Sequence, residues 1–172
     1  MINVGSKRAL EKWSSKLEER ERVETKILVG YETTLLDIAG AMGYPMNLAQ
    51  SWPGNDACHG WTFITCDSQG KNVTVINFSK QHFVGTISPA YGDLASLRNL
   101  LLNDNNLTGS IPDGMIALPQ LQILDVSNNN LTGKIPSFPP KVNVKTSGNL
   151  LLGSDTPTGG GIDNIVMERN KI

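Results

Sequence analysis

The hydrophobic positions in the middle of the chain recur with a period of 24 residues. Residues 97–112 read LRNLLLNDNNLTGSIP and residues 121–136 read LQILDVSNNNLTGKIP, with apolar residues, asparagine, glycine and proline at the same places. Residues 73–88, VTVINFSKQHFVGTIS, form a weaker copy in which Gln81 replaces the asparagine. A fixed period of this length is typical of a solenoid, and the pattern indicates a leucine-rich repeat.

Each copy contains a short strand whose alternate side chains point inward. Asn105 follows the strand, where a buried asparagine can bond backbone groups that the bend leaves unpaired, and stacked copies would form a ladder. Gly109 permits backbone angles that other residues resist, and Pro112 fixes φ where no donor is needed. We therefore predict an α/β leucine-rich-repeat solenoid with a short parallel sheet of about three coils, near the minimum for a stable stack.

A helical pattern at residues 33–52 precedes the repeats. Thr34 and Asp37 resemble a capping box, Gly43 is expected to end the first helix, and a second short helix is expected before Trp52. The open end of a solenoid needs a lid with a polar outside, and this segment is placed to provide one.

Two cysteines, Cys58 and Cys66, lie in the predicted cap. A bridge between them would close a small loop and stabilise the cap by about 2–3 kcal/mol in the chain-entropy model. Metal binding is the alternative, but His59 and His82 do not complete a zinc-finger spacing, so we predict a disulfide and no metal. Trp61, between the cysteines, is expected to pack against the first coil.

Residues 1–30 differ in composition from the repeats: 12 of the 20 residues in the range 7–26 are charged, with both signs interspersed. Leu10, Trp13 and Leu17 give a narrow apolar stripe at helical spacing. We interpret the segment as a solvated helix or disordered extension rather than a partner-binding or coiled-coil helix, because two heptads are too few for a stable coiled coil.

The C-terminal part loses the repeat pattern. Val142 and Val144 predict a final strand beside the third coil, and residues 149–153 a last local contact. The predicted segments are 1–30, a charged helical or disordered extension; 31–70, the cap; 71–153, three repeats and a C-terminal closure; and 154–172, a flexible tail.

The net charge of −1 and the absence of a basic cluster in the repeats argue against nucleic-acid binding. No apolar run approaches the roughly 20 residues of a membrane helix. Four sequons and the cysteine pair favour an oxidising, extracytoplasmic setting. The first 16 residues lack the apolar core of a secretory signal, so we expect a fragment or an incorrectly assigned start. The sequon asparagines, our predicted glycosylation sites, are Asn72, Asn77, Asn106 and Asn130.

Longer strings carry a resemblance to a known family. They are Ser51-Trp52-Pro-Gly-Asn-Asp56, Gly85-Thr-Ile-Ser-Pro89, Asp104-Asn-Asn-Leu-Thr-Gly109, Leu124-Asp-Val-Ser-Asn-Asn129, Gly133-Lys-Ile-Pro136 and Gly148-Asn149. With this cap before them, they resemble the second leucine-rich-repeat block in the ectodomain of plant transmembrane-kinase-type receptor-like kinases. The match runs from about Thr34 to Gly153. It departs at Ala57, where the family has proline, and at Phe63, where it has glycine.

The resemblance implies a place on the extracellular face of the plasma membrane, before a membrane helix and a Ser/Thr kinase, in auxin-responsive growth signalling. The chain has no Gly-rich phosphate loop and no kinase catalytic-loop signature, so we predict no enzymatic activity, no catalytic residues and no cofactor.

The strand residues between the inward ones would face the concave surface and bind a protein or peptide ligand, or another receptor ectodomain. The alternative is that these side chains simply face water. A glycan on Asn77 would block this face, so binding there predicts that Asn77 is unmodified. The predicted concave surface comprises Val75, Asn77, Ser79, Lys80, Asn99, Leu101, Asn103, Asp104, Ile123, Asp125, Ser127 and Asn128.

The sequence therefore favours a non-catalytic recognition module of a receptor ectodomain. Two other functions stay open: a soluble secreted leucine-rich-repeat inhibitor of a cell-wall-degrading enzyme, and a truncated receptor product without its own partner. The inhibitor hypothesis predicts a signal peptide and a longer, more charged concave face, and the low coil count favours the truncated product.

Overall fold

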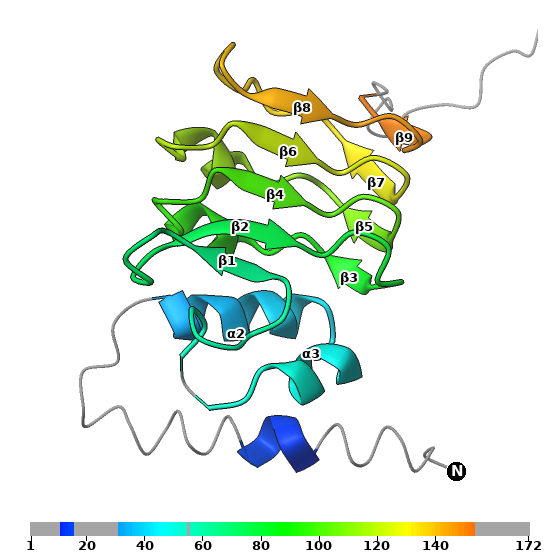
Figure 1. Ribbon diagram of the computed structural model, residues 1–172. Coiled ribbons are helices and arrows are strands. Elements are labelled where there is room, and N and C mark those ends of the chain that lie inside the picture. Colours follow the sequence, from blue (N-terminus) through cyan, green and yellow to red (C-terminus); the bar gives the residue numbers. More distant parts are fainter. Residues whose placement is uncertain (1–10, 16–30, 55, 154–172) are drawn as a thin grey trace, which may run out of the picture.

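The structure is a computed structural model that describes residues 11–15, 31–54 and 56–153. Two helices lie at one end of a stack of strands, and the last strands close the other end (Figure 1). The predicted tail at 154–172 lies outside the described residues.

The cap contains helix α2 (Tyr31–Ala41) and helix α3 (Met46–Ser51). Because α2 begins at Tyr31, Thr34 lies inside the helix and is buried, so the expected capping box at Thr34 is wrong. Gly43 ends α2 as predicted, with φ of +70°, and the Tyr44 amide donates back to the Ala39 carbonyl at 2.9 Å.

The concave side is a five-stranded sheet in the order β1-β2-β4-β6-β8. Strand β1 pairs antiparallel with β2, and the other neighbours are parallel. The predicted final strand is confirmed, because β8 pairs with β6. The strands are β1 (Ile64–Cys66), β2 (Val73–Asn77), β4 (Asn99–Leu101), β6 (Ile123–Asp125) and β8 (Asn143–Lys145).

A second sheet, which we did not predict, has the order β3-β5-β7-β9. Its strands are two to four residues long. Two 3-10 helices, Pro89–Asp93 and Asp113–Ala117, follow β3 and β5. The strands are β3 (Val84–Thr86), β5 (Asn106–Gly109), β7 (Asn130–Gly133) and β9 (Leu151–Leu152).

The repeated apolar positions form one continuous core. Leu100 and Leu124 are 0% exposed, and each such side chain contributes roughly 1.5–3 kcal/mol on burial. At Ile135 the exposed fraction rises to 42%, because the stack ends nearby. The other buried repeat positions include Ile76, Phe78, Phe83, Ile87, Leu97, Leu102, Leu107, Ile111, Leu121, Val126 and Leu131.

The predicted asparagine ladder is present. Asn105 Nδ2 donates to the carbonyls of Phe78, Leu102 and Asn103 at 2.7, 2.9 and 3.2 Å. Asn129 repeats this arrangement one coil later. These bonds join the turn of each coil to backbone carbonyls of its own coil and of the coil before it.

The ladder has two ends that the sequence pattern did not reveal. Asn149 forms a further rung, accepting from the Leu131 amide at 3.0 Å and donating to the Val126 carbonyl at 2.9 Å. At the other end, Gln81 Nε2 donates to the Ser79 carbonyl, and its Oε1 accepts from Asn47 Nδ2 of α3 at 3.2 Å. The longer glutamine therefore joins the first coil to the cap.

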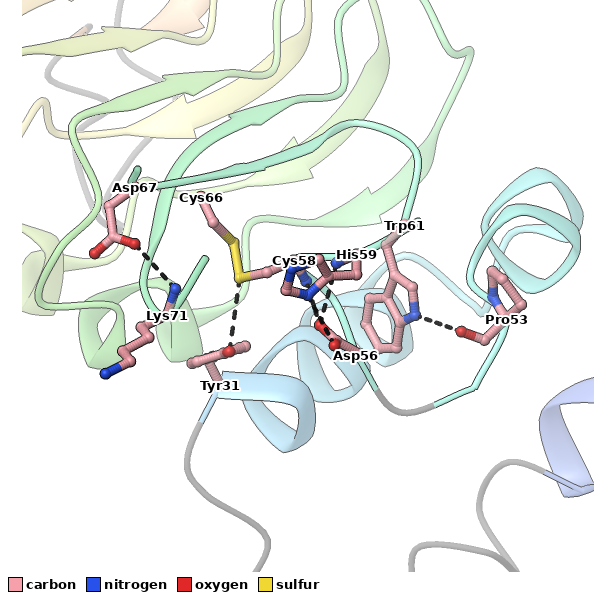
Figure 2. Close-up of polar contacts among 9 residues, drawn as sticks. All are labelled: Tyr31, Pro53, Asp56, Cys58, His59, Trp61, Cys66, Asp67 and Lys71. Atoms are coloured by element: carbon pink, nitrogen blue, oxygen red, sulfur yellow. Dashed lines mark hydrogen bonds and ion pairs between the residues drawn. A yellow bond between two sulfur atoms is a disulfide. The ribbon is translucent and has the colours of Figure 1, made fainter. Parts of the chain in front are cut away.

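The predicted disulfide between Cys58 and Cys66 is confirmed, with Cα atoms 5.5 Å apart (Figure 2). The Trp61 ring stacks on the Trp52 ring, with centroids 4.5 Å apart, inside the core that the cap shares with the first coil. The Trp52 ring in turn contacts the Phe78 ring of the first coil. The Trp61 Nε1 donates to the Pro53 carbonyl at 2.9 Å (Figure 2).

Gly85 of the first coil lies directly against the backbone at the end of helix α2 in the cap. Its φ is +98°, and a Cβ there would clash with the Ala41 carbonyl and the Met42 backbone. We expect Gly85→Ala to lower the free energy of unfolding by about 2–3 kcal/mol, from overpacking and backbone strain. Urea titration measures the change. Gly114→Ala is the matched control, because a Cβ there meets open space; equal effects at both glycines would contradict this account of the contact.

Candidate recognition surface

The register of the parallel strands arranges the concave surface in columns. Pairing places Asn99 between Val75 and Ile123, and Leu101 between Asn77 and Asp125. Inward neighbours on the same strands are fully buried, whereas these side chains are at least partly exposed except for Asp125, which is 8% exposed. That these residues bind a ligand stays a prediction.

The structure adds a fourth strand to this surface. Asn143 extends the column of Ile123, and Lys145 extends the column of Asp125. Lys145 Nζ lies 3.5 Å from Asp125 Oδ2. We missed these two residues, although the alternating valines that predicted the strand also indicate that Asn143 and Lys145 face outward.

A hydrogen-bonded polar network occupies the carboxyl ends of the strands. Ser79 Oγ donates to Asn103 Oδ1 at 2.7 Å, and Asn103 Nδ2 donates to Asp104 Oδ2 at 2.6 Å. Asn128 Nδ2 donates to Asp104 Oδ1 at 2.7 Å. These bonds cross between coils and hold the side chains in place, so a ligand would meet a prearranged set of polar groups.

Hydrogen bonds from Asn128 and Asn103, together with the charge of Lys80, hold the pKa of Asp104 below its usual value. A carboxyl with a depressed folded-state pKa favours folding above its unfolded pKa, and this contribution is lost as pH falls through the folded value.

We expect Asn128→Gly, which keeps the positive φ of this position, to raise the Asp104 pKa, because the variant loses the hydrogen bond to Asp104 Oδ1. Carbon-13 NMR titration of the carboxyl measures it. Asn106→Ala, in β5, is the control, and an unchanged Asp104 pKa in Asn128→Gly would contradict the assignment.

The opposite edge of the sheet contains unpaired polar groups. A shallow pocket there includes Thr74, Val75, Arg98, Asn99 and Gln122. Arg98 is exposed and has no ion pair within the described part of the chain. Asn99 Oδ1 is buried and accepts no hydrogen bond from any described residue. Of these five residues, only Val75 and Asn99 belong to the predicted concave surface. Thr74 lies near the start of β2, and Arg98 and Gln122 directly precede β4 and β6, so the prediction did not include them.

The side chains of all four sequon asparagines are exposed. Asn106 and Asn130 come after β4 and β6 in the chain and are the first residues of strands β5 and β7 of the second sheet. Asn77 lies on the concave surface as expected, beside Leu101. Glycosylation itself stays a prediction.

The histidines form no catalytic set in the described ranges. His59 Nδ1 lies 2.9 Å from Asp56 Oδ2 on the exposed cap loop (Figure 2), and His82 is exposed. Within residues 11–15, 31–54 and 56–153, no three acidic, cysteine or histidine side chains cluster to hold a metal. In the same ranges, no helix combines the length and apolarity needed to cross a membrane.

Comparison with known families supports the cap and the repeats. The leucine rich repeat N-terminal domain model matches residues 32–67, and the Leucine Rich repeats (2 copies) model matches residues 95–140. One model describes the domain that precedes leucine-rich repeats and the other describes the repeats themselves; neither is a kinase domain.

Among curated proteins, the receptor-like kinase TMK4 of Arabidopsis thaliana is 55% identical over 73 residues, covering 42% of this chain and 8% of that protein. The receptor protein kinase WSS1 of Oryza sativa subsp. japonica is 48% identical over 119 residues, covering 69% of this chain and 13% of that protein. The chain therefore spans only a small part of these relatives.

Among solved structures, the crystal structure of PEPR1-AtPEP1 aligns with a TM-score of 0.56 and 34% sequence identity. The alignment covers 61% of this chain and 15% of that chain.

Proposed function

We propose that this chain, a leucine-rich-repeat segment of the plant receptor-like kinase ectodomain type, is a non-catalytic recognition module that binds a peptide or another ectodomain on its concave surface. The observation that supports the proposal is the alignment of outward-facing side chains across the neighbouring strands β2, β4 and β6. Val75, Leu101 and Ile123 supply partly exposed apolar area, and fixed polar side chains border it. An apolar centre with a polar rim is typical of protein interfaces.

The unpaired groups at one edge indicate what the ligand would offer. Asn99 Oδ1 is buried and accepts no hydrogen bond from a described residue, and the exposed Arg98 forms no ion pair within residues 11–15, 31–54 and 56–153. An extended peptide presents both a backbone N–H and a carbonyl or carboxylate at each step along its length. Four parallel strands at about 4.8 Å spacing give a face only about 15 Å across, so we expect modest affinity for a short peptide.

The test uses a random peptide library displayed on phage, selected against the refolded, oxidised chain. Binding of the selected peptides should weaken at least about tenfold in Leu101→Arg, because a charge replaces central apolar area. Val84→Arg is the matched control, since Val84 is 55% exposed but lies in the second sheet. Equal loss in both variants, or none in Leu101→Arg, would contradict the proposed surface.

The same proposal places the module outside the cytosol, where the Cys58–Cys66 bridge persists. An N-glycan on Asn77 would project from the concave surface, so the proposal predicts that Asn77 is unmodified in protein made by plant cells. Glycopeptide mapping measures this. Full occupancy of Asn77 would rule out binding at the centre of the surface.

A further inference from the structure

The described N-terminal residues pack against the cap. Residues 11–15 are helical, and Trp13 is 2% exposed while its four neighbours in this range are exposed. In Figure 1 this turn of helix lies beside α3, on the side of the cap away from the sheets. The Trp13 ring is 4.8 Å from the Tyr44 ring and 6.4 Å, edge-on, from the Trp52 ring. Within residues 11–15, the contact with the cap is therefore made by one buried aromatic side chain, which the sequence interpretation did not anticipate.

We propose that the outer face of the cap is a docking surface for the chain's own N-terminal segment, with Trp13 as the anchor. Neither matched family model includes this segment, since they begin at residues 32 and 95. Docked there, Trp13 contacts the rings of Tyr44 and Trp52 on the side of the cap that faces away from the repeats.

Three residues of the cap form the slot that receives the indole. Trp52 is 0% exposed and forms its floor. Tyr44 forms a wall: it sits in the turn after α2 with φ of +55°, and its ring lies close against Gly40. A Cβ on Gly40 would approach the Tyr44 hydroxyl at 3.1 Å, so glycine at this place lets the tyrosine ring lie against the helix.

The slot is continuous with the core of the repeats. Trp52 also contacts Trp61 and Phe78, and Phe78 contacts Phe83 in the first coil. Trp13 thus extends a line of aromatic rings that begins in the first coil. Aromatic pairs at these centroid separations are attractive beyond simple burial of area.

The ring of Trp13, rather than its N–H group, provides the attraction. Trp13 Nε1 is buried and finds no acceptor among the described residues, whereas Trp52 Nε1 and Trp61 Nε1 donate to carbonyls at 2.9 Å. A buried donor without a partner opposes docking. The slot therefore suits any aromatic ring on a short helix with polar flanks. Phenylalanine at position 13 should bind in the slot as well as tryptophan does.

Trypsin cleavage after Lys12 reports docking, because a protease cuts a bound helical segment only when it opens. We expect cleavage after Lys12 to be at least about tenfold faster in Trp13→Ala than in the unaltered chain, and nearly unchanged in Trp13→Phe. Ser14→Ala is the control, because Ser14 is exposed in the same turn. Cleavage after Lys134 and Lys141, both exposed in the last coils, reports whether the repeats stay folded.

A second variant tests the slot itself. Tyr44→Ala should also accelerate cleavage after Lys12, and the double variant should be no faster than Trp13→Ala alone, because Trp13→Ala already removes the contact with Tyr44. Acceleration at Lys134 and Lys141 as well in Trp13→Ala would still support docking, since Trp13 can stabilise the repeats only when it is bound. Equal cleavage after Lys12 in the unaltered chain and Trp13→Ala, or additive effects of the two changes, would overturn the proposal. None of these readouts depends on the concave surface.

Discussion

Trp52→Ala should lower the free energy of unfolding by about 3–5 kcal/mol, the range for truncating a fully buried tryptophan. Trp52 is 0% exposed, stacks on Trp61 at an interplanar angle of 9° and contacts Phe78 of the first coil. Its Nε1 also donates to the Thr62 carbonyl at 2.9 Å, which would lose its donor. The side chain therefore joins the helices, the disulfide loop and the first coil.

Urea titration of the oxidised protein, followed by circular dichroism, measures the loss. Val84→Ala is the control, because Val84 is 55% exposed, and its effect should stay within about 0.5 kcal/mol. A loss below about 1 kcal/mol for Trp52→Ala would mean that the cap does not pack on the repeats through this residue.

Asn129→Ala should cost about 3–4 kcal/mol, because one side chain satisfies several backbone groups at once. Its Nδ2 donates to the carbonyls of Leu102, Val126 and Ser127, and its Oδ1 accepts from the Leu107 amide at 2.9 Å. Alanine would leave the Leu107 N–H without a partner beside a buried leucine.

The matched control for the ladder is Asn106→Ala, since Asn106 is exposed and lies one residue past the equivalent position of the previous coil. The same urea titration should show a change of no more than about 0.5 kcal/mol for that variant. Similar losses at both asparagines would contradict the ladder as the source of the stability.

The repeat pattern alone was enough to predict the coils, their strands and the ladder at Asn105 and Asn129. It did not reveal the rung at Asn149, because that residue follows Asn129 by 20 positions rather than 24 and the surrounding leucine pattern is lost. The second sheet escaped prediction for a related reason. Its strands are held by neighbouring coils and not by any alternation of their own.

The two helices and the disulfide of the cap were predicted from the sequence, whereas the predicted capping box at Thr34 was wrong. Periodicity placed the buried face of α2 correctly, since Leu35 and Ile38 are 0% exposed. It could not show which aromatic ring stacks on which, because Trp13, Trp52 and Trp61 meet only in the folded chain. Long-range packing of this kind leaves no local sequence signal.

Phe63 illustrates a departure that the structure explains in part. The resemblance noted above places glycine at this position, and Phe63 adopts a φ of +72°, a conformation that favours glycine. Its ring contacts Phe78 at a centroid distance of 6.0 Å, which offsets part of the backbone strain. The other departure, Ala57, is 1% exposed and accommodated in the cap.

For the recognition surface, alternation along the strands was sufficient to predict the outward columns. It did not reveal that Asn99 Oδ1 accepts no hydrogen bond from a described residue, because hydrogen-bond partners depend on neighbouring coils. The ligand also has no signature in the chain, since many peptides satisfy one apolar patch and a few polar groups.

Chemical-shift mapping by NMR tests the recognition surface most directly. A peptide selected from the library is titrated into the oxidised, nitrogen-15-labelled chain, and backbone and side-chain amide signals are followed. The proposal predicts that the largest shifts fall on β2, β4 and β6 and include the side-chain amides of Asn99 and Asn103. Largest shifts on β3, β5 and β7, or on α2 and α3, would contradict it and move recognition to another face.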